Sequence, residues 1–185
     1  TLVLTPTAGL AVGSYTVEIG YRGKIGDQAQ GVFFDQYPTP SGDKTMIGTQ
    51  MEATDARRVF PCWDEPVFRA TYDLTLVLPE SFVVSTNMPA IRETSLPGGL
   101  KETSFARTPS MPSYLVAIFA GEFDVLAEEH DGIQLRILAT EGKRESARYA
   151  MEVTKRVLDY FHDYFGLRYP LPKLDQIGVP NAFSG

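Results

Sequence analysis

Residues 49–66 are the part of the chain richest in side chains that can bind a ligand or take part in chemistry. Within this stretch, Gln50 and Glu52 are two positions apart, so on an extended strand their side chains would point to the same side. A carboxylate in that position has two interpretations. It is either an exposed strand residue, or it binds a cationic group through a charge-assisted hydrogen bond.

The rest of this stretch is predicted to be a packed loop held together by ion pairs. Thr54 or Asp55 is positioned to cap a short helical turn. We expect Phe60 and Trp63 to bury against a sheet, with Cys62 between them as a small apolar residue. The residues available for the ion pairs are Arg57, Arg58, Asp64 and Glu65.

The chain has two histidines, His130 and His162. A helical zinc site of the His-Glu-x-x-His kind needs two imidazoles one turn apart. His162 has no histidine three or four residues away, so we interpret it as a helix-surface residue, and His130 as a loop residue. The sequence also lacks a serine nucleophile elbow, a glycine-rich phosphate loop and a Cys-His pair. No residue of this chain is therefore predicted to be catalytic or to bind a metal.

The composition indicates a soluble globular protein, with 43% hydrophobic and 22% charged residues. The net charge of -6 and the pI near 4.9 argue against a nucleic-acid partner, because phosphate binding needs a basic surface. The sequence has no run of eighteen apolar residues, so no transmembrane segment is predicted. Cys62 is the single cysteine, which excludes an intrachain disulfide.

Residues 1 to about 139 are predicted to form a series of short strands. The clearest is 68–78, where apolar and polar residues alternate with a period of two until Pro79. Residues 115–120 are continuously apolar, as expected of a strand covered on both faces. Other expected strands are 15–21, 32–34, 82–85, 101–107 after a hairpin turn at 97–99, 123–125 and 133–137. Such a series favours an antiparallel sandwich or a large curved sheet.

The periodicity changes near residue 144. Residues 145–165 are predicted to be a helix that ends at Gly166, and 175–179 a final strand. One face of this helix carries the apolar residues Ala150, Val153, Val157, Phe161 and Tyr164 at three- and four-residue steps. We expect the part of this face from Ala150 to Phe161 to be left uncovered in this chain. We place a domain boundary between Asp131 and Gly132, where a turn precedes this strand-then-helix unit.

Several of these segments are similar to one known family. Residues 49–66 resemble the stretch of zinc aminopeptidases that reads approximately Thr-Gln-x-x-Ala-x-Asp-Ala-Arg-x-x-Phe-Pro-Cys-x-Asp-Glu-Pro. Residues 164–175 resemble the segment after the first helix of that family's catalytic domain, and 179–185 the run into its Gly-Ala-Met-Glu-Asn motif. Residues 112–117 and 121–123 match the family's sheet. Across essentially its whole length, the chain resembles the membrane alanyl aminopeptidase (gluzincin) family.

This resemblance implies a mainly β fold. Residues 1–131 would form a saddle-like antiparallel β-sheet or sandwich domain, the family's N-terminal domain without its opening strands. Residues 132–185 would be the truncated start of a thermolysin-like α/β catalytic domain, with its first strand and helix. The family's cofactor is zinc, and its zinc ligands, general-base Glu and transition-state Tyr would all lie beyond residue 185. The resemblance thus implies a fragment that neither binds zinc specifically nor cleaves peptides.

The resemblance also implies roles for Gln50 and Glu52. In the family, these positions line the pocket for the first residue of the substrate, and the second helps to hold the free α-amine. A carboxylate suits that role because it accepts a charge-assisted hydrogen bond from an ammonium group and discriminates against uncharged internal peptide bonds. Some relatives have Gln at the position of Glu52.

The expected partners are peptide substrates with a free N-terminus and the remainder of the catalytic domain. Two alternatives stay open. One is a catalytically silent relative that acts as a scaffold or interaction module, although Glu52 in its expected place argues against silence. The other is an epoxide-opening hydrolase built on the same scaffold, which pocket residues outside this chain would distinguish.

Overall fold

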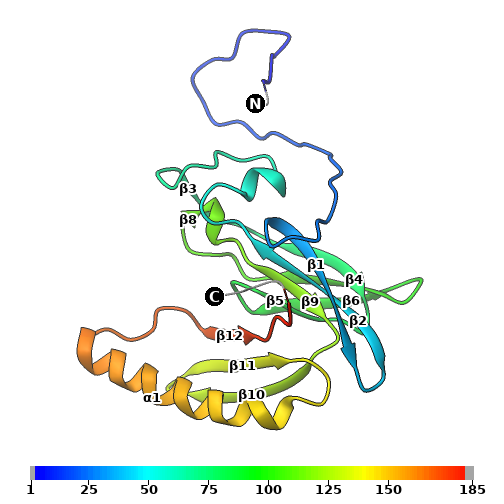
Figure 1. Ribbon diagram of the computed structural model, residues 1–185. Helices are drawn as coiled ribbons and strands as arrows, with labels where there is room; N and C mark the ends of the chain where they lie inside the picture. Colours follow the sequence, from blue (N-terminus) through cyan, green and yellow to red (C-terminus); the bar gives the residue numbers. More distant parts are fainter. Residues whose placement is uncertain (1–2, 182–185) are drawn as a thin grey trace.

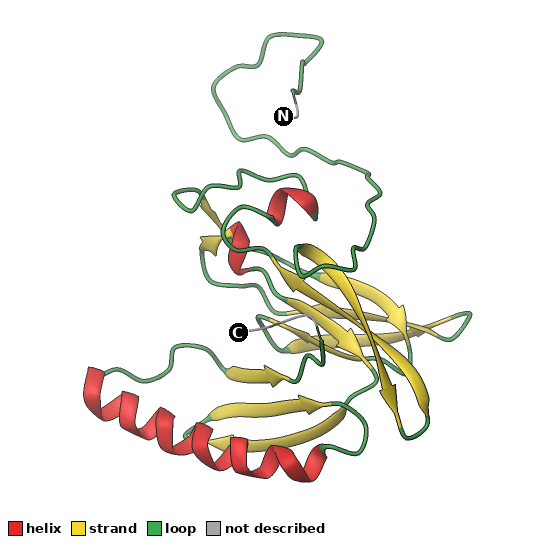
Figure 2. Ribbon diagram, viewed as in Figure 1, coloured by secondary structure: helices red, strands yellow, loops and turns green. Residues whose placement is uncertain are grey.

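The computed structural model describes residues 3–181, which form mainly antiparallel β-sheet with one α-helix near the C-terminal end (Figures 1 and 2). The predicted fold class is confirmed. The strands are β1 (Gly31–Thr39), β2 (Gly42–Gln50), β3 (Arg69–Ala70), β4 (Thr75–Pro79), β5 (Val83–Thr86), β6 (Ala90–Leu96), β7 (Leu100–Phe105), β8 (Met111–Pro112), β9 (Ile118–Gly121), β10 (Asp124–His130), β11 (Ile133–Ala139) and β12 (Lys173–Ile177). The helices are α1 (Ala147–Phe165) and the 3-10 turns η1 (Ala56–Arg58), η2 (Ser113–Leu115) and η3 (Arg144–Ser146).

The central sheet has the strand order β1-β2-β9-β5, so β1 lies at an edge. Pro38 is accepted within β1 because one side of an edge strand has no hydrogen-bonded neighbour. From the same strand, Asp35 accepts hydrogen bonds from Asn181, at 2.8 Å from the main-chain N–H and 3.0 Å from the side-chain amide. This contact joins β1 to the chain that follows β12.

Gly48 allows two aromatic rings to pack on β2. An added Cβ at this position would lie 2.8 Å from a ring carbon of Phe33 and 2.8 Å from one of Phe119. Because Phe33 is completely buried, its ring has little room to move away, and β2 needs a glycine here.

The three-stranded sheet β4-β7-β6 contains the predicted hairpin turn. Gly98 and Gly99 both have positive φ, 82° and 71°, as a tight turn between β6 and β7 favours. The predicted strand 68–78 is wrong in one respect, because it is divided into β3 and β4. In the gap, the Tyr72 N–H bonds to the Thr108 hydroxyl at 2.9 Å and the Thr108 N–H to the Tyr72 carbonyl at 3.0 Å. A side chain thus replaces one backbone acceptor and interrupts the ladder.

The predicted strand 115–120 begins later than expected. Residues 113–115 form η2, in which the Val116 N–H bonds to the Ser113 carbonyl at 3.1 Å, and β9 starts at Ile118. The remaining part of the apolar run fits its prediction, since β9 lies between β2 and β5 in the central sheet. The strands β5, β7, β10, β11 and β12 lie close to their predicted positions.

A second layer consists of the sheet β10-β11-β12 and the helix α1, which covers one face of this sheet (Figure 1). β10 and β11 form an antiparallel hairpin, and β12 returns parallel to β11 after α1. The buried residues between sheet and helix are Leu126, Ile133, Leu135, Ile137, Ala147, Met151 and Leu158. The domain boundary expected between Asp131 and Gly132 falls in the turn of the β10–β11 hairpin, and it stays a prediction.

The helix α1 is confirmed, and so is its cap at Gly166, which has φ 63°. The predicted apolar face is largely uncovered, as expected: Val157 and Phe161 are 41% and 45% exposed, while Ala150 is partly buried against the core. The residues buried against the sheet are Ala147, Met151, Thr154 and Leu158. The helix therefore has a second stripe, which the periodicity argument did not single out.

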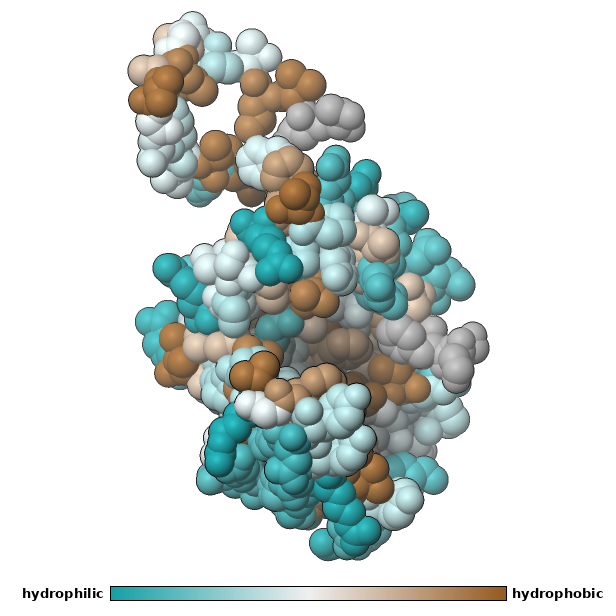
Figure 3. All heavy atoms as spheres, turned by 90° about the vertical axis from the view of Figure 1, so that its left-hand side faces the viewer, coloured by the Kyte–Doolittle hydropathy of each residue, from teal (hydrophilic) through white to brown (hydrophobic). Residues whose placement is uncertain are grey.

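The predicted strand 15–21 is absent. These residues have no secondary structure in the described chain, and their apolar side chains are exposed. In the space-filling view the N-terminal segment projects away from the body with hydrophobic residues along it (Figure 3). The alternation was real, but a strand also needs a neighbour for its backbone hydrogen bonds, and the described residues provide none there. Among residues 3–181, no helix is long and apolar enough to cross a membrane.

Candidate functional site

Gln50 and Glu52 lie where β2 ends. Gln50 is the last residue of the strand, opposite Gly31 of β1. Glu52 follows in a turn that begins after the strand, with the Asp55 N–H bonded to the Met51 carbonyl at 2.9 Å. The expectation that both residues share one extended strand is therefore wrong, because the backbone turns between them.

The turn nevertheless brings the two residues into contact. The Glu52 N–H donates to the side-chain oxygen Oε1 of Gln50 at 3.1 Å, while the Glu52 side chain is exposed. Met51 between them is 1% exposed and packs with Ala56 and Val116. A buried anchor thus fixes the turn and leaves the Glu52 carboxylate directed to solvent, where it is available to a cationic ligand.

The short helix η1 follows this turn and is held by an ion pair that the sequence suggested. Asp64 accepts hydrogen bonds from Arg57 at the main-chain N–H (3.0 Å) and at Nε (2.8 Å), and from the Ser113 hydroxyl at 3.0 Å. Burial raises the pKa of Asp64, but the hydrogen bonds from Arg57 and Ser113 outweigh it, and the pKa lies below its usual value. The charged form of this buried carboxylate is therefore fully partnered.

Gly31 permits the close approach of η1 to β1. It has φ +70°, and an added Cβ would lie 3.0 Å from the Cβ of Arg58. The Arg58 side chain bonds instead to Asp55 at 2.6 Å. Since Gly31 is also paired with Gln50, this contact fixes the position of η1 relative to the end of β2.

The predicted burial of Trp63 is wrong, since its side chain is 78% exposed. Phe60 and Cys62 behave as expected and pack at the edge of the core cluster around Met51. Phe60 contacts Tyr72 edge-on, with ring centroids 6.1 Å apart. Because Asp64 must point inward to reach Arg57 and Ser113, its neighbour Trp63 points outward.

Both histidines are bound by aspartates in the hairpin and helix region, in a pocket of about 750 Å³ at the C-terminal end of α1. His130 Nε2 lies 2.6 Å from Asp159, and His162 Nδ1 lies 3.3 Å from Asp131. His162 Nε2 accepts the Tyr169 N–H at 2.9 Å. The earlier interpretation needs correction: His130 ends β10 rather than lying in a loop, and the His162 side chain is only 14% exposed.

These residues do not fit a zinc site. In residues 3–181, no group of three or more His, Cys, Asp or Glu side chains is arranged to hold a metal ion. His162 uses Nε2 to accept a main-chain hydrogen bond, so that nitrogen's lone pair is already engaged.

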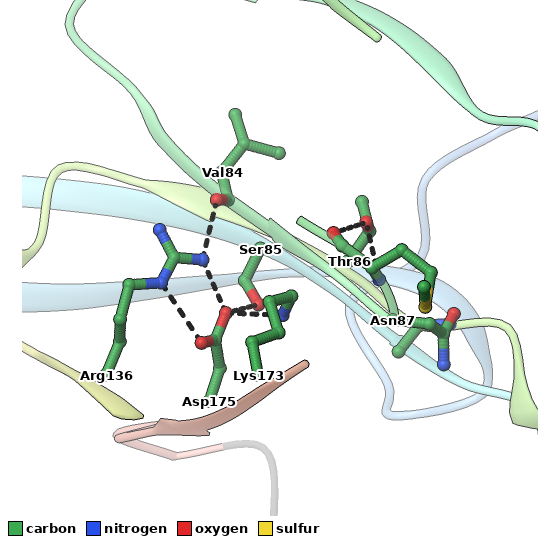
Figure 4. Close-up of polar contacts among 9 residues, drawn as sticks. Val84, Ser85, Thr86, Asn87, Arg136, Lys173 and Asp175 are labelled. Carbon is green, nitrogen blue, oxygen red and sulfur yellow. Dashed lines mark hydrogen bonds and ion pairs between the residues drawn. The ribbon is translucent and has the colours of Figure 1, made fainter. Parts of the chain in front are cut away.

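Arg136, Lys173 and Asp175 form a buried ionic cluster that was not predicted from the sequence (Figure 4). The sequence feature that relates to this cluster is the alternation in β11, where Gln134 and Arg136 lie between buried apolar residues. Alone, that pattern predicts a solvent-facing side of the strand. The second sheet that covers this side is distant in sequence, so the pattern did not reveal it.

Comparison with known proteins gives consistent matches. The family described as the Peptidase M1 N-terminal domain matches residues 1–115. Aminopeptidase N of Acetobacter pasteurianus is 39% identical over 178 residues, which cover 96% of this chain and 50% of that protein. Aminopeptidase M1-B of Oryza sativa subsp. japonica is 40% identical over 177 residues, covering 95% and 20%. Puromycin-sensitive aminopeptidase of Caenorhabditis elegans is 35% identical over 172 residues, covering 91% and 18%. The chain thus spans half or less of the length of each of these relatives.

Proposed function

Since the chain belongs to the family of Peptidase M1 N-terminal domains, we propose that it is part of a zinc aminopeptidase that removes N-terminal residues from peptides. One observation carries the proposal: aminopeptidases match along 96% of the chain, well beyond the family domain at 1–115. In this proposal, residues 1–131 are the N-terminal β domain and 132–185 begin the catalytic domain.

We assign the recognition of the substrate's free amine to Glu52. Its exposed carboxylate can accept a charge-assisted hydrogen bond from an α-ammonium group. Gln50 shapes the pocket for the first substrate residue and orders Glu52 through the bond to its N–H. An acylated N-terminus has no charge and loses this interaction, which would make the complete enzyme an exopeptidase.

Zinc, in this proposal, is held by residues outside this chain, since the described residues do not fit a metal site. The 185-residue chain alone is accordingly expected to show no peptidase activity and no stoichiometric zinc. Equilibrium dialysis against zinc and an anilide assay would test both. Hydrolysis by the pure chain that a chelator abolishes would overturn the assignment of zinc to other residues.

The proposed function itself is tested with the complete polypeptide. Alanyl p-nitroanilide should be hydrolysed, and the N-acetylated compound should not. Equal hydrolysis of the two compounds would exclude amine recognition. Failure to hydrolyse any of a panel of amino-acid anilides, with zinc bound, would contradict the aminopeptidase assignment.

A further inference from the structure

The sheet β10-β11-β12 has an apolar face towards α1 and an opposite face that is part polar and part apolar, with Leu138 among its buried residues. The apolar face packs on α1. On the other face, β11 carries Gln134 and Arg136, and their register partners in β12 are Lys173 and Asp175. Gln134 is exposed, but the other polar residues contact the central sheet: Asp175 reaches Ser85 of β5 at 2.5 Å, and Arg136 reaches the Val84 carbonyl at 3.4 Å. The two sheets therefore meet across a polar layer at this end, beside an apolar cluster that contains Leu138 and Met46.

Asp175 is the centre of this layer (Figure 4). Its carboxylate accepts hydrogen bonds from Arg136 Nε at 3.0 Å, from Arg136 Nη2, from Lys173 Nζ at 2.7 Å and from the Ser85 hydroxyl. The side chains of Asp175 and Lys173 are 3% and 4% exposed. Two cations thus share one carboxylate, and the buried cluster carries an excess positive charge.

The cations also have hydrogen-bond donors to spare. Among the described residues, Asp175 is the single acceptor for Lys173 Nζ, which has three N–H groups. Arg136 donates hydrogen bonds from Nε and Nη2, whereas Nη1 has no acceptor among residues 3–181. Leaving donors of a buried ammonium group unsatisfied is expensive, so water or an anion is expected to complete the Lys173 ammonium group.

A pocket adjoins these donors. It has a volume of about 420 Å³ and is lined by Lys173, Arg136 and Gln134 on one side and by Lys101 and Thr103 of β7 on the other. Two carboxylates also line it, but neither balances the cluster. Glu93 is half-exposed and lies 3.4 Å from Lys101, and the exposed Glu80 accepts the Ser95 hydroxyl at 2.9 Å.

We propose that this pocket binds a small anion, such as a halide, a carboxylate or phosphate, with Lys173 and Arg136 supplying its positive charge. The anion would satisfy the spare donors and neutralise the excess charge at the junction of the two sheets. The site is separate from Gln50 and Glu52, and it does not depend on the proposed peptidase activity.

Anion binding would also resolve a conflict at Lys173. Burial lowers the pKa of this residue, while the contact with Asp175 opposes that shift. An anion beside the ammonium group would favour its charged form further. Loss of the proton would be the alternative way to remove the excess charge.

Thermal unfolding of the protein in chloride, acetate or phosphate, at constant ionic strength, tests the proposal. A ligand that binds the folded state raises Tm with its concentration, and at one hundred times Kd the rise should be about 5–10 °C. Lys173→Met should abolish this dependence. Lys155→Met is the matched control, because Lys155 makes an ion pair with Glu128 away from the pocket; it should respond as the wild type does. The anion that acts at the lowest concentration identifies the ligand class.

Two outcomes would overturn the anion site: a wild-type Tm that is insensitive to all three anions, or a Lys173→Met variant that responds as the wild type does. If Lys173→Met does not fold, Lys173→Gln preserves a hydrogen bond to Asp175 without the charge. Line broadening of chloride-35 in the NMR spectrum of the wild type, reversed by phosphate, provides a direct second measurement. If the protein does not change the chloride-35 line width, it has no chloride site. If added phosphate does not reverse the broadening, chloride and phosphate do not compete for the same site.

Discussion

The Glu52 main-chain N–H donates a hydrogen bond to the side-chain oxygen of Gln50 across 3.1 Å. One residue of the candidate site thereby orders the backbone of the other. Because the bond uses the Glu52 main chain, it leaves the carboxylate of Glu52 available to a ligand, and the contribution of each side chain can be measured separately.

The proposed function predicts that Glu52→Ala, in the complete polypeptide, lowers kcat/KM for substrates with a free N-terminus by about ten- to a hundredfold. Loss of a hydrogen bond to a charged group corresponds to roughly 1.5–3 kcal/mol. Glu52→Gln should lose less, since an amide oxygen still accepts from an ammonium group. Steady-state kinetics on the variants would check this. Arg58→Ala is the control, because Arg58 has a structural role in η1, where it pairs with Asp55 and packs near Gly31: it should affect Tm before catalysis. An unchanged kcat/KM in Glu52→Ala would show that this residue is only a surface carboxylate.

Leu158 and Val157 are neighbours in α1 with opposite environments. Leu158 is 7% exposed in the core against the sheet, and Val157 is 41% exposed. Leu158→Ala should therefore reduce the free energy of unfolding by about 2–5 kcal/mol, and Val157→Ala by no more than about 0.5 kcal/mol. Urea denaturation would measure both. Equal losses would mean that the exposed stripe of α1 is covered in solution, for instance by self-association.

Gly48→Ala should destabilise the protein by about 1–3 kcal/mol, because the new methyl group would press on the buried rings of Phe33 and Phe119. Gly20→Ala is a matched control with no atom within 4 Å of the added Cβ, and it should leave Tm unchanged. A neutral effect of Gly48→Ala would indicate that the central sheet is more loosely packed than the structure shows.

Asp64 should contribute to stability in a pH-dependent way. Its pKa in the folded protein is lowered, since the hydrogen bonds from Arg57 and Ser113 outweigh the effect of burial. A depressed pKa stabilises the folded state above the unfolded value of about 3.9. That contribution is lost as the pH falls from there through the folded pKa. Asp64→Asn should accordingly be less stable than the wild type at pH 7, with a difference that shrinks below about pH 4.

Urea midpoints at pH 7, 5 and 3 would measure this trend. Asp73→Asn serves as the comparison, because Asp73 also pairs with an arginine, Arg107, but both side chains are exposed. Its effect should be much smaller at every pH. A difference for Asp64→Asn that stays constant from pH 7 to pH 3 would show that the lost stability is not electrostatic.

The elements that the sequence predicted correctly are those determined by local residues. The helix α1 follows from its periodicity and Gly166, and the β6–β7 hairpin from its two adjacent glycines. The ion pair between Arg57 and Asp64 is one of the four that two arginines and two carboxylates of this loop could form. It was predictable because both residues lie in the same short loop, seven positions apart.

The errors arose where a distant segment decides the outcome. The strand expected at 15–21 has no neighbouring strand in the described chain. The stripe of α1 that packs on the sheet, with Met151 and Leu158, was not identified from the sequence, because which stripe is buried depends on the sheet. The contact of Arg136 with β5 could not be predicted, because the two strands are far apart in the sequence. At the candidate site, the assignment of Gln50 and Glu52 stays a prediction, and the turn between them could not be read from the sequence.

The Asp35–Asn181 contact has a consequence for synthesis on the ribosome. The two residues are separated by 146 positions, so at about 5–20 residues per second Asn181 is made roughly 7–30 s after Asp35. Throughout that interval the Asp35 carboxylate lacks both of its donors, and the Gln36 carbonyl lacks the Asn181 amide. The edge strand β1 is then more open to strand pairing with a neighbouring nascent chain than it is once Asn181 has docked on it.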